Sequence, residues 1–339
     1  MLEQATALGT PVGSDPVRPL APRSVFETPD YRAVYDVDRV VEIDPGDGVA
    51  LVFHDCGDHA ICLARTASLD AGLMERASRA LFDDVRFRFV VFEDVHLAPS
   101  FAVPAGVLRL RYQNDWILPI DGPEPGLRHS FLRKMDKKLR RMARDFGDIS
   151  LELEHAPSRQ LVEATIDLNR KRIEATGQSY RMDDAKRERL AKALSRIGVA
   201  AVLRHGDRLV AADLFVQCGR DAYAILGGYD PAYHRDSPGL QTMRHAVEYF
   251  EARDFGTVHL MWGDGGYKEW LGARRMPLST LIVPRSAGEW LSPAILRVAA
   301  RYGVLDLKRR AKEWGLSGET VKKIGEWPKR LQLALRPGG

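Results

Sequence analysis

Residues 227–278 read GGYDPAYHRDSPGLQTMRHAVEYFEARDFGTVHLMWGDGGYKEWLGARRMPL, and this stretch decides the fold. Apolar side chains recur in it at helical spacing and predict a helix, namely Leu240, Met243, Val247 and Phe250. Ser237 is a suitable N-cap for this helix, Pro238 suits its first position, and Gly239 lets a ligand approach the backbone. The apolar run 257–261 predicts a strand directly afterwards.

Three strand-like runs precede this helix, at 198–204, 208–217 and 220–227, and short turns join them, so we expect an antiparallel meander. Upstream of the meander, the pattern predicts a strand at 149–154, followed by two helices. A helix that begins at the end of the last strand offers unpaired backbone N–H groups and the positive end of its dipole. Such a helix start is a suitable site for pyrophosphate.

We assign this anion site to the residues around the helix start, namely Arg235, Ser237, Pro238, Gly239 and Leu240. The Arg235 guanidinium can add a charge-assisted hydrogen bond to a phosphate. The alternative is an ordinary helix start of the Pro-Gly type without a ligand.

Composition narrows the class of protein. A chain of 339 residues with 45% hydrophobic and 28% charged residues predicts about two compact domains. Residues 1–125 carry a net charge of −9 and the rest of the chain +13, so an anionic partner is expected for the C-terminal part. The three cysteines form neither a disulfide framework nor a metal-ligand spacing, and we expect no metal. Since the chain shows neither a signal peptide nor an apolar run of ~20 residues, we expect a cytoplasmic protein.

Four segments are expected along the chain. Residues 1–24 are rich in proline and predict an extended or disordered arm, and 25–120 predict an α+β module. The Pro/Gly-rich stretch 119–126 marks a boundary, after which 127–288 form the catalytic domain. Residues 289–339, with 11 Lys and Arg, predict a basic helical tail packed on the domain. A membrane-surface or partner helix is the alternative for this tail, but membrane contact is not expected.

A helix with an apolar stripe begins near residue 128, and its stripe consists of Phe131, Met135, Leu139, Met142 and Phe146. Its other side is densely basic, with Arg133, Lys134, Lys137, Lys138, Arg140, Arg141 and Arg144. A solvated surface is the ordinary interpretation of such a face, and contact with RNA phosphates is the alternative.

Several spaced elements carry a resemblance to a known family: Tyr229-Asp-Pro-Ala-Tyr233, Ser237-Pro-Gly239, Gly263, Tyr267-Lys268 with Gly272, the basic helix from Phe131, and a helix ending in Arg172-x-x-x-x-Gly177. Over residues 128–283 they resemble the GNAT-type acetyltransferase domain of CelD-type proteins associated with cellulose biosynthesis. That domain is related to the Fem-type aminoacyltransferases of peptidoglycan. The resemblance implies a mixed α/β GNAT acyltransferase fold in two tandem modules, with a degenerate one at 25–120 and a helical tail.

The resemblance also suggests roles for single residues. Lys268 lies where many GNAT enzymes carry an acidic tyrosine, so it stabilises an oxyanion or a phosphate, donates a proton, or is simply an exposed lysine. Tyr267 is a proton donor or a packing ring. Tyr229 and Arg172 are assigned to substrate binding.

Two further residues are candidate bases. Where the relatives commonly have Asp-Phe-Gly-Arg-Gly, this chain has His259-Leu-Met-Trp-Gly263, and His259 is either a general base or a hydrogen-bonded core histidine. Asp213 interrupts an apolar strand and is a base, an anchor for the acceptor amine, or the partner of an arginine such as Arg172. Replacing Lys268 or His259 is expected to depress transfer without unfolding the protein.

The expected reaction moves an acyl group from a phosphopantetheine thioester, either acyl-CoA or an acyl-carrier protein, to a small amine acceptor. No tightly bound cofactor is expected, because the thioester is a co-substrate. Aminoacyl-tRNA as donor is the first alternative, and a non-catalytic GNAT-fold binding module is the second. The oligomeric state is not readable from the sequence.

Overall fold

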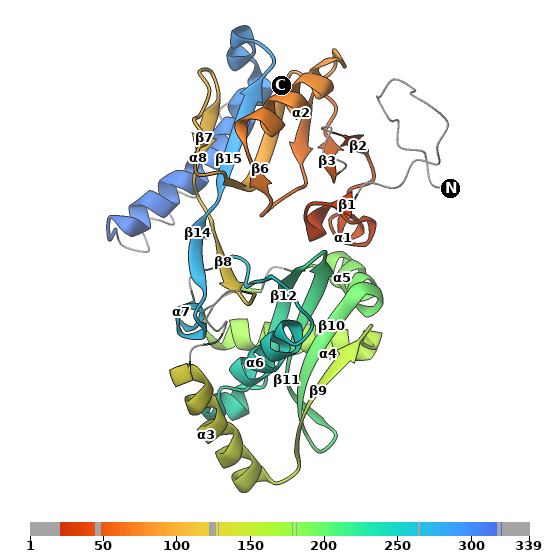
Figure 1. Ribbon diagram of the computed structural model, residues 1–339, viewed down its shortest axis with the longest axis vertical. Helices are drawn as coiled ribbons and strands as arrows, with labels where there is room; N and C mark the ends of the chain where they lie inside the picture. Colours follow the sequence, from red (N-terminus) through yellow and green to blue (C-terminus); the bar gives the residue numbers. More distant parts are fainter. Residues whose placement is uncertain are drawn as a thin grey trace, which may run out of the picture. The chain divides into compact units, whose positions relative to one another are not determined.

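The computed structural model describes residues 21–44, 49–121, 127, 129–177, 179–180, 182–263, 265–316 and 320. The chain has a mixed α/β fold and divides into two compact units, each with its own sheet (Figure 1). The first unit comprises Met1–Glu27, Asp38–Asn114 and Pro277–Gly339, and the second comprises Thr28–Val37 and Asp115–Met276. Residues 1–20 of the expected arm, 122–126 of the expected boundary, and 317–319 and 321–339 of the tail lie outside the described residues.

The second unit contains the sequence stretch that decides the fold. In chain order, its elements are α1 (Pro29–Val34), β8 (Asn114–Pro119), α3 (His129–Phe146), β9 (Ile149–His155), α4 (Arg159–Ala175), α5 (Asp184–Ile197), β10 (Gly198–His205), β11 (Arg208–Cys218), β12 (Asp221–Tyr229), the 3-10 turn η2 (Pro231–Asp236), α6 (Pro238–Glu251), β13 (Thr257–His259), α7 (Tyr267–Leu271) and β14 (Arg274–Pro277). The sheet order is β14-β8-β13-β12-β11-β10-β9.

The strands β10 to β12 form the expected antiparallel meander, and β9 pairs with β10 in the antiparallel sense. β13 then pairs in parallel with β12, from Asp221↔Thr257 to Tyr223↔His259. β12 continues to Tyr229 beside β11, and an extra residue, Ile225, shifts the register of that pair. Since a bulge bends its strand, β12 turns away from the line of β13 beyond their short paired stretch.

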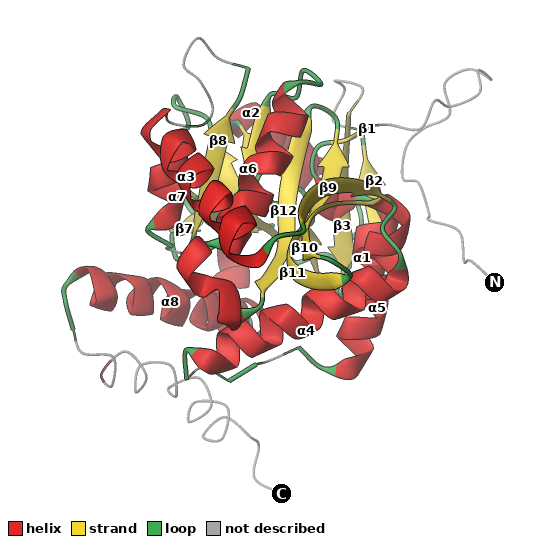
Figure 2. Ribbon diagram, turned by 90° about the horizontal axis from the view of Figure 1, so that it is seen from below, coloured by secondary structure: helices red, strands yellow, loops and turns green. Residues whose placement is uncertain are grey.

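α4 and α6 cover opposite faces of the meander (Figure 2). Consecutive residues of a strand face opposite sides of the sheet, so Gly227 and Gly228 of β12 face different helices. A Cβ at Gly228 would lie 2.6 Å from the backbone nitrogen of Asn169 in α4. A Cβ at Gly227 would collide with the carboxylate of Asp213, which accepts a hydrogen bond from Thr242 of α6. Only glycine at both positions allows this close packing.

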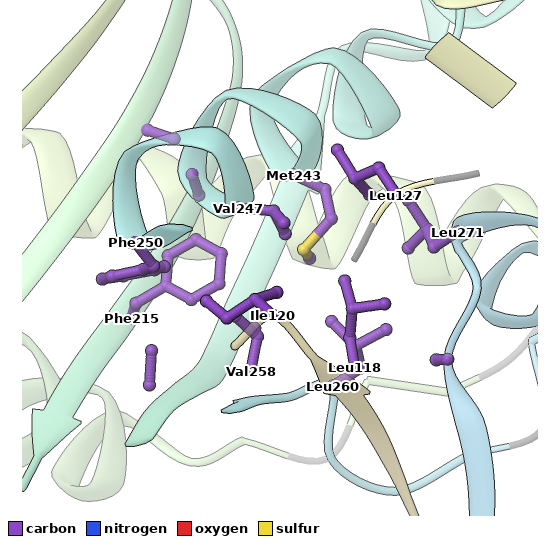
Figure 3. Packing of buried hydrophobic residues seen from close by; sticks show 14 of the residues in the cluster. Leu118, Ile120, Leu127, Phe215, Met243, Val247, Phe250, Val258, Leu260 and Leu271 are labelled. Atoms are coloured by element: carbon purple, nitrogen blue, oxygen red, sulfur yellow. The ribbon is translucent and has the colours of Figure 1, made fainter. Parts of the chain in front are cut away.

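The main core of the second unit lies between α6, α3 and the strands β8, β12 and β13 (Figure 3). The predicted apolar stripe of α6 is confirmed, because Met243, Val247 and Phe250 are buried in this core. The stripe of α3 contributes Phe131 and Met135. Burial of these stripes fixes α3 and α6 side by side, so the N-terminal turn of α6 faces α3.

The first unit carries the other sheet. Its elements are β1 (Ala21–Pro22), η1 (Val25–Glu27), β2 (Val40–Ile43), β3 (Val49–Asp55), β4 (His59–Cys62), β5 (Ser68–Leu69), α2 (Ala71–Phe82), β6 (Phe89–Leu97), β7 (Leu108–Leu110), β15 (Ser279–Pro284), η3 (Ala287–Leu291) and α8 (Pro293–Glu313). β4, α2 and β6 form a parallel β-α-β crossover after antiparallel strands, which is the same order as β12, α6 and β13 in the second unit.

The units divide the chain at other places than the boundaries we expected from the sequence. β8, assigned to the module 25–120, pairs with β13 in the second unit. β15, assigned to the domain 127–288, pairs with β6 and β7 in the first unit. These pairings join segments that are far apart in the sequence, for example Ser279↔Val95, so no local pattern signals them.

Gly228→Ala is expected to lower the free energy of unfolding by about 1–3 kcal/mol, because the added Cβ would push against the backbone of α4. Urea unfolding followed by circular dichroism measures the change. Gly303→Ala, in α8 with no neighbouring atom within 4 Å of its Cβ position, is the control and should stabilise by about 0.5–1 kcal/mol. Equal unfolding midpoints for Gly228→Ala and the wild type would contradict the packing described here.

Candidate active site

Asp213 is a buried carboxylate in the middle of β11. Its Oδ2 atom accepts a hydrogen bond of 2.6 Å from the Thr242 hydroxyl of α6. Burial raises the pKa of Asp213 to about 7, while the Thr242 hydrogen bond and the charge of Arg172 oppose this rise. A carboxylate with such a pKa can accept a proton near neutral pH, which is what a general base requires.

The structure brings Tyr267 and Arg172 close to this carboxylate. Tyr267 is 38% exposed, and the desolvation of its hydroxyl, together with the charge of Asp213, raises its pKa to about 12, while Arg172 opposes the rise. Arg172 lies in the last turn of α4 and Tyr267 at the start of α7. Asp213, Tyr267 and Arg172 thus form one electrostatic cluster, at the part of β12 that extends beyond its pairing with β13.

A second cluster surrounds the N-terminal end of α6. The Lys138 ammonium of α3 donates a hydrogen bond to the hydroxyl of Ser237. Arg141, one turn further along α3, pairs with Asp236 at 2.7 Å and donates to the backbone oxygen of Arg235 at 3.0 Å. Burial and the charges of Lys134 and Arg141 lower the pKa of Lys138. Three cations of α3 therefore converge on the positive end of a helix dipole, where an anion would be stabilised.

A groove of about 240 Å³ opens beside this helix start. Its lining residues are Ser130, Phe131, Lys134, Met135, Lys138, Ser237, Leu240 and Trp270. The Lys134 ammonium lies 4.8 Å from the centre of the Trp270 ring, in a cation–π contact. The groove therefore combines an apolar floor with two lysines.

The residues predicted for the anion site do not all take the expected positions. Ser237 and Leu240 line the groove, and Pro238 begins α6 as expected. Ser237 adopts a left-handed conformation with φ of 54°, and its hydroxyl is bound by Lys138 instead of capping the helix. Ser237 is therefore the N-cap residue, as expected, but its side chain does not cap the helix. The Arg235 side chain is exposed. A Cβ added at Gly239 would lie 3.4 Å from the ring of Tyr229.

Lys268 is buried, with 3% of its surface exposed. Its ammonium donates hydrogen bonds of 2.9 Å to three backbone carbonyls, those of Leu260, Met261 and Trp262. Met261 has a left-handed backbone with φ of 57°, so the three carbonyls follow a tight turn around the ammonium. This geometry favours a structural role for Lys268 over the catalytic role expected from the sequence, because its three N–H donors point at the protein's own backbone.

His259 is also buried at the end of β13. Its Nδ1 atom donates to the Asp115 carboxylate at 2.6 Å, its Nε2 atom lies 4.0 Å from Asp221, and its ring stacks on Tyr223 at 4.5 Å. Of the two interpretations left open by the sequence, these contacts favour the hydrogen-bonded core histidine.

Sequence reasoning missed Thr242, Lys134, Lys138 and Trp270 as parts of the site. A signal existed for the lysines. Lys134, Lys138 and Arg141 recur at spacings of 4 and 3, so they form a separate row of α3 beside its apolar stripe. The sequence-based interpretation treated all seven bases of this helix as one solvated face, so that row was missed.

Among the described residues, no group of three His, Cys, Asp or Glu side chains is arranged to hold a metal ion.

Lys268→Met is expected to lower the free energy of unfolding by about 3 kcal/mol or more, because three buried carbonyls would lose their hydrogen-bond donor. Thermal unfolding followed by circular dichroism measures the loss. The control is Lys137→Met, at an exposed position of α3, which should melt like the wild type. A Lys268→Met variant with the wild-type melting temperature would return Lys268 to the list of catalytic candidates.

Residues 130–269 match the family model of the acetyltransferase (GNAT) domain. A comparison with curated protein sequences finds no match. Among solved structures, FemX is similar to this chain with a TM-score of 0.57 at 11% identity, covering 79% of this chain and 94% of FemX.

Two further solved structures are similar at 12% identity and a TM-score of 0.51. One is the C-terminal DUF2156 domain assigned to a lysylphosphatidylglycerol synthetase of Agrobacterium fabrum, covering 80% of this chain and 92% of that one. The other is a protein of unknown function from Bacteroides thetaiotaomicron, covering 76% and 88%. At such identities the likeness concerns the fold alone. The expected mixed α/β fold is confirmed, and residues 130–269 carry a GNAT-type acetyltransferase domain; the CelD-type relationship stays a prediction.

Proposed function

We propose that this protein is an N-acyltransferase that moves an acyl group from a phosphopantetheine thioester, acyl-CoA or an acyl-carrier protein, to an amine. One observation carries the proposal. Lys134, Lys138 and Arg141 converge on the N-terminal end of α6, and Asp213, with its raised pKa, hydrogen-bonds to Thr242 of the same helix.

The cluster at the helix start supports a phosphate-bearing donor. Arg141 is already neutralised by Asp236, whereas Lys138 is partly buried against a hydroxyl at the positive helix end. Burial beside other cations is costly for an ammonium and lowers its pKa, and a bound phosphate would remove that cost. Ser237, with its left-handed backbone, directs the chain into α6 at this point, and local strain of this kind is common at ligand sites.

The two clusters lie along one line. The ring of Tyr229, at the end of β12, lies 3.4 Å from the place of a Cβ at Gly239, at the start of α6. Gly227, which faces Asp213, is two residues back from Tyr229, or about 7 Å along the strand. Tyr223, which stacks on His259, is six residues back, or about 20 Å. A donor arm that runs from the helix start along β12 therefore passes Asp213 and Tyr267 before it reaches His259.

The reaction assigns a proton to each group. The amine nitrogen attacks the thioester carbonyl carbon, a C–N bond forms, and the C–S bond breaks when the tetrahedral intermediate collapses. The Asp213 carboxylate accepts the proton that the amine loses. The Tyr267 hydroxyl, which interacts electrostatically with that carboxylate, donates a proton to the leaving thiolate, and the proton taken up by Asp213 is returned to the Tyr267 oxygen. Arg172 keeps the negative charge of the cluster balanced.

Lys138→Met is expected to weaken CoA binding about tenfold or more, because a charge-assisted hydrogen bond to phosphate contributes about 1.5–3 kcal/mol. Isothermal titration of the full chain with CoA measures this change. The control is Lys137→Met, which should leave the affinity unchanged, because the Lys137 side chain is exposed and neither lines the groove nor takes part in the contacts to the start of α6 described above. Wild-type protein that does not bind CoA, or equal losses in both variants, would contradict the donor site.

Asp213→Asn is expected to abolish the rise of the transfer rate between pH 6 and 8 and to lower the rate by about 10²–10⁴-fold, as for loss of a general base. The same substitution should make the protein more stable than the wild type at high pH. Since the folded-state pKa of Asp213, about 7, lies above its ordinary value of 3.8, the wild-type protein loses stability as the pH rises between these values. Urea unfolding should therefore show Asp213→Asn gaining on the wild type by a few kcal/mol from pH 4 to pH 8. A rate without a titrating group near pH 7 would remove Asp213 from the mechanism.

Aminoacyl-tRNA is the second candidate donor, and a specific observation favours it. Arg133, Lys137, Arg140 and Arg144 are exposed on α3, outside the row that faces α6. Such a row can contact RNA phosphates, and binding would then weaken steeply as the salt concentration rises. Salt-sensitive tRNA binding lost on charge reversal at Lys137 and Arg140, with no CoA binding, would favour this donor.

A further inference from the structure

The helix α8 presents two sides. One side packs on the sheet of the first unit through Ile295 and Tyr302, and Tyr302 donates a hydrogen bond of 2.9 Å to Glu93 of β6. In Figure 1, the C-terminal part of α8 extends beyond the neighbouring strand β7. The tail is thus a packed helix, as we expected, but its other side needs a separate explanation.

Large apolar side chains lie exposed along this other side. Leu296 is 54% exposed, Leu307 38% and Trp314, which ends the helix, 69%. At 100° per residue, these three positions fall within about 20° of one line that runs about 27 Å along the helix. Ala300 and Gly303 lie between them on the same side, so the line is straight and without large protrusions. Leu291, just before the helix, is 84% exposed.

Basic side chains accompany this apolar line. α8 contains six Lys and Arg against two Asp and Glu, and one of these acids, Asp306, is buried and paired with Arg309 and Arg310. Arg297, Arg301 and Lys308 lie on one flank of the line and Arg310 on the other. The parts of the first unit that precede α8, residues 1–27, 38–114 and 277–292, carry 16 Asp and Glu against 11 Arg, a net charge of −5, so α8 differs from them in the sign of its charge.

We propose that α8 docks the protein on an anionic lipid surface, with Leu296, Leu307 and Trp314 inserted at the interface and the flanking Lys and Arg side chains contacting lipid phosphates. A straight, narrow apolar line with basic flanks and a terminal tryptophan fits a flat interface of this kind. Long basic side chains keep their charged ends at the headgroups while their stems lie on the apolar side.

A second copy of this chain fits the same surface less well. Pairing α8 with α8 would bring the basic flanks of both helices together, and like charges repel. The chain needs no membrane-spanning segment for this contact, and no helix in the described part is long and apolar enough to be one. The proposal takes up the membrane-surface alternative that the sequence left open for the tail, against the expectation of no membrane contact, and it does not depend on the proposed transferase function.

The test is co-sedimentation of the full chain with vesicles of equal parts phosphatidylcholine and phosphatidylglycerol, compared with vesicles of phosphatidylcholine alone. Wild-type protein should bind the anionic vesicles about tenfold more strongly or better, and added salt should reduce binding. Leu307→Glu should weaken binding about tenfold or more at an unchanged melting temperature. The control is Val85→Glu, at a position 81% exposed outside α8, which should bind like the wild type.

Three outcomes would overturn the proposal. One is wild-type protein that does not sediment with anionic vesicles. Another is equal binding by Leu307→Glu and the wild type. The third is a dimer in sedimentation velocity that Leu307→Glu dissociates without any effect on vesicle binding, which would assign the apolar line to a second copy of the chain.

Trp314 gives an independent readout. The fluorescence of the wild-type protein should shift to the blue on vesicle addition, and this shift should be lost in Trp314→Phe.

Discussion

The contact between the Lys268 ammonium and the carbonyls of Leu260, Met261 and Trp262 determines where the second unit can have a site. Three carbonyl dipoles that point at one place repel each other, and the ammonium makes their turn stable. The turn leads the chain away from β12 directly after His259, so the parallel pairing stops at Tyr223. The rest of β12 then lies beside α6 and the Asp213 carboxylate without β13 covering it.

The first unit shows the same crossover with a different outcome. β4 pairs in parallel with the first part of β6, up to Cys62↔Phe92. After a gap, the next strand, β5, pairs in parallel with the end of β6 at Ser68↔His96. Between these places, Arg65 forms an ion pair with Glu93, and the Thr66 N–H donates to the Asp94 backbone oxygen at 2.7 Å. A β-α-β crossover alone therefore does not create a site. Whether a site can form depends on what lies between the parallel strands. In the first unit, an ion pair and a backbone hydrogen bond lie there.

The sequence predicted the elements of the second unit better than their assembly. Periodicity located α3, α6 and the meander, because each buries one regular stripe of side chains. It gave no sign of β14, whose residues Arg274–Pro277 are exposed, or of the pairing of β15 with β6, because the whole second-unit segment from Asp115 separates these two strands in the sequence. Lys268 was singled out for catalysis, whereas its contacts favour a structural role. The sequence could not decide between these roles, since a lysine that binds carbonyls and a lysine that binds substrate look alike in a sequence.

The charge asymmetry between the two parts of the chain has more than one physical origin. In α3, the row Lys134, Lys138 and Arg141 faces the start of α6, so its charge belongs to a local anion site. The bases of α8 belong to the first unit, whose parts before this helix carry a net negative charge, and they flank an apolar line instead of a helix start. The net charge of +13 over residues 126–339 therefore combines two surfaces with different chemistry. A partly buried lysine at a helix end selects one small anion, whereas exposed bases beside leucine and tryptophan respond to an extended anionic surface.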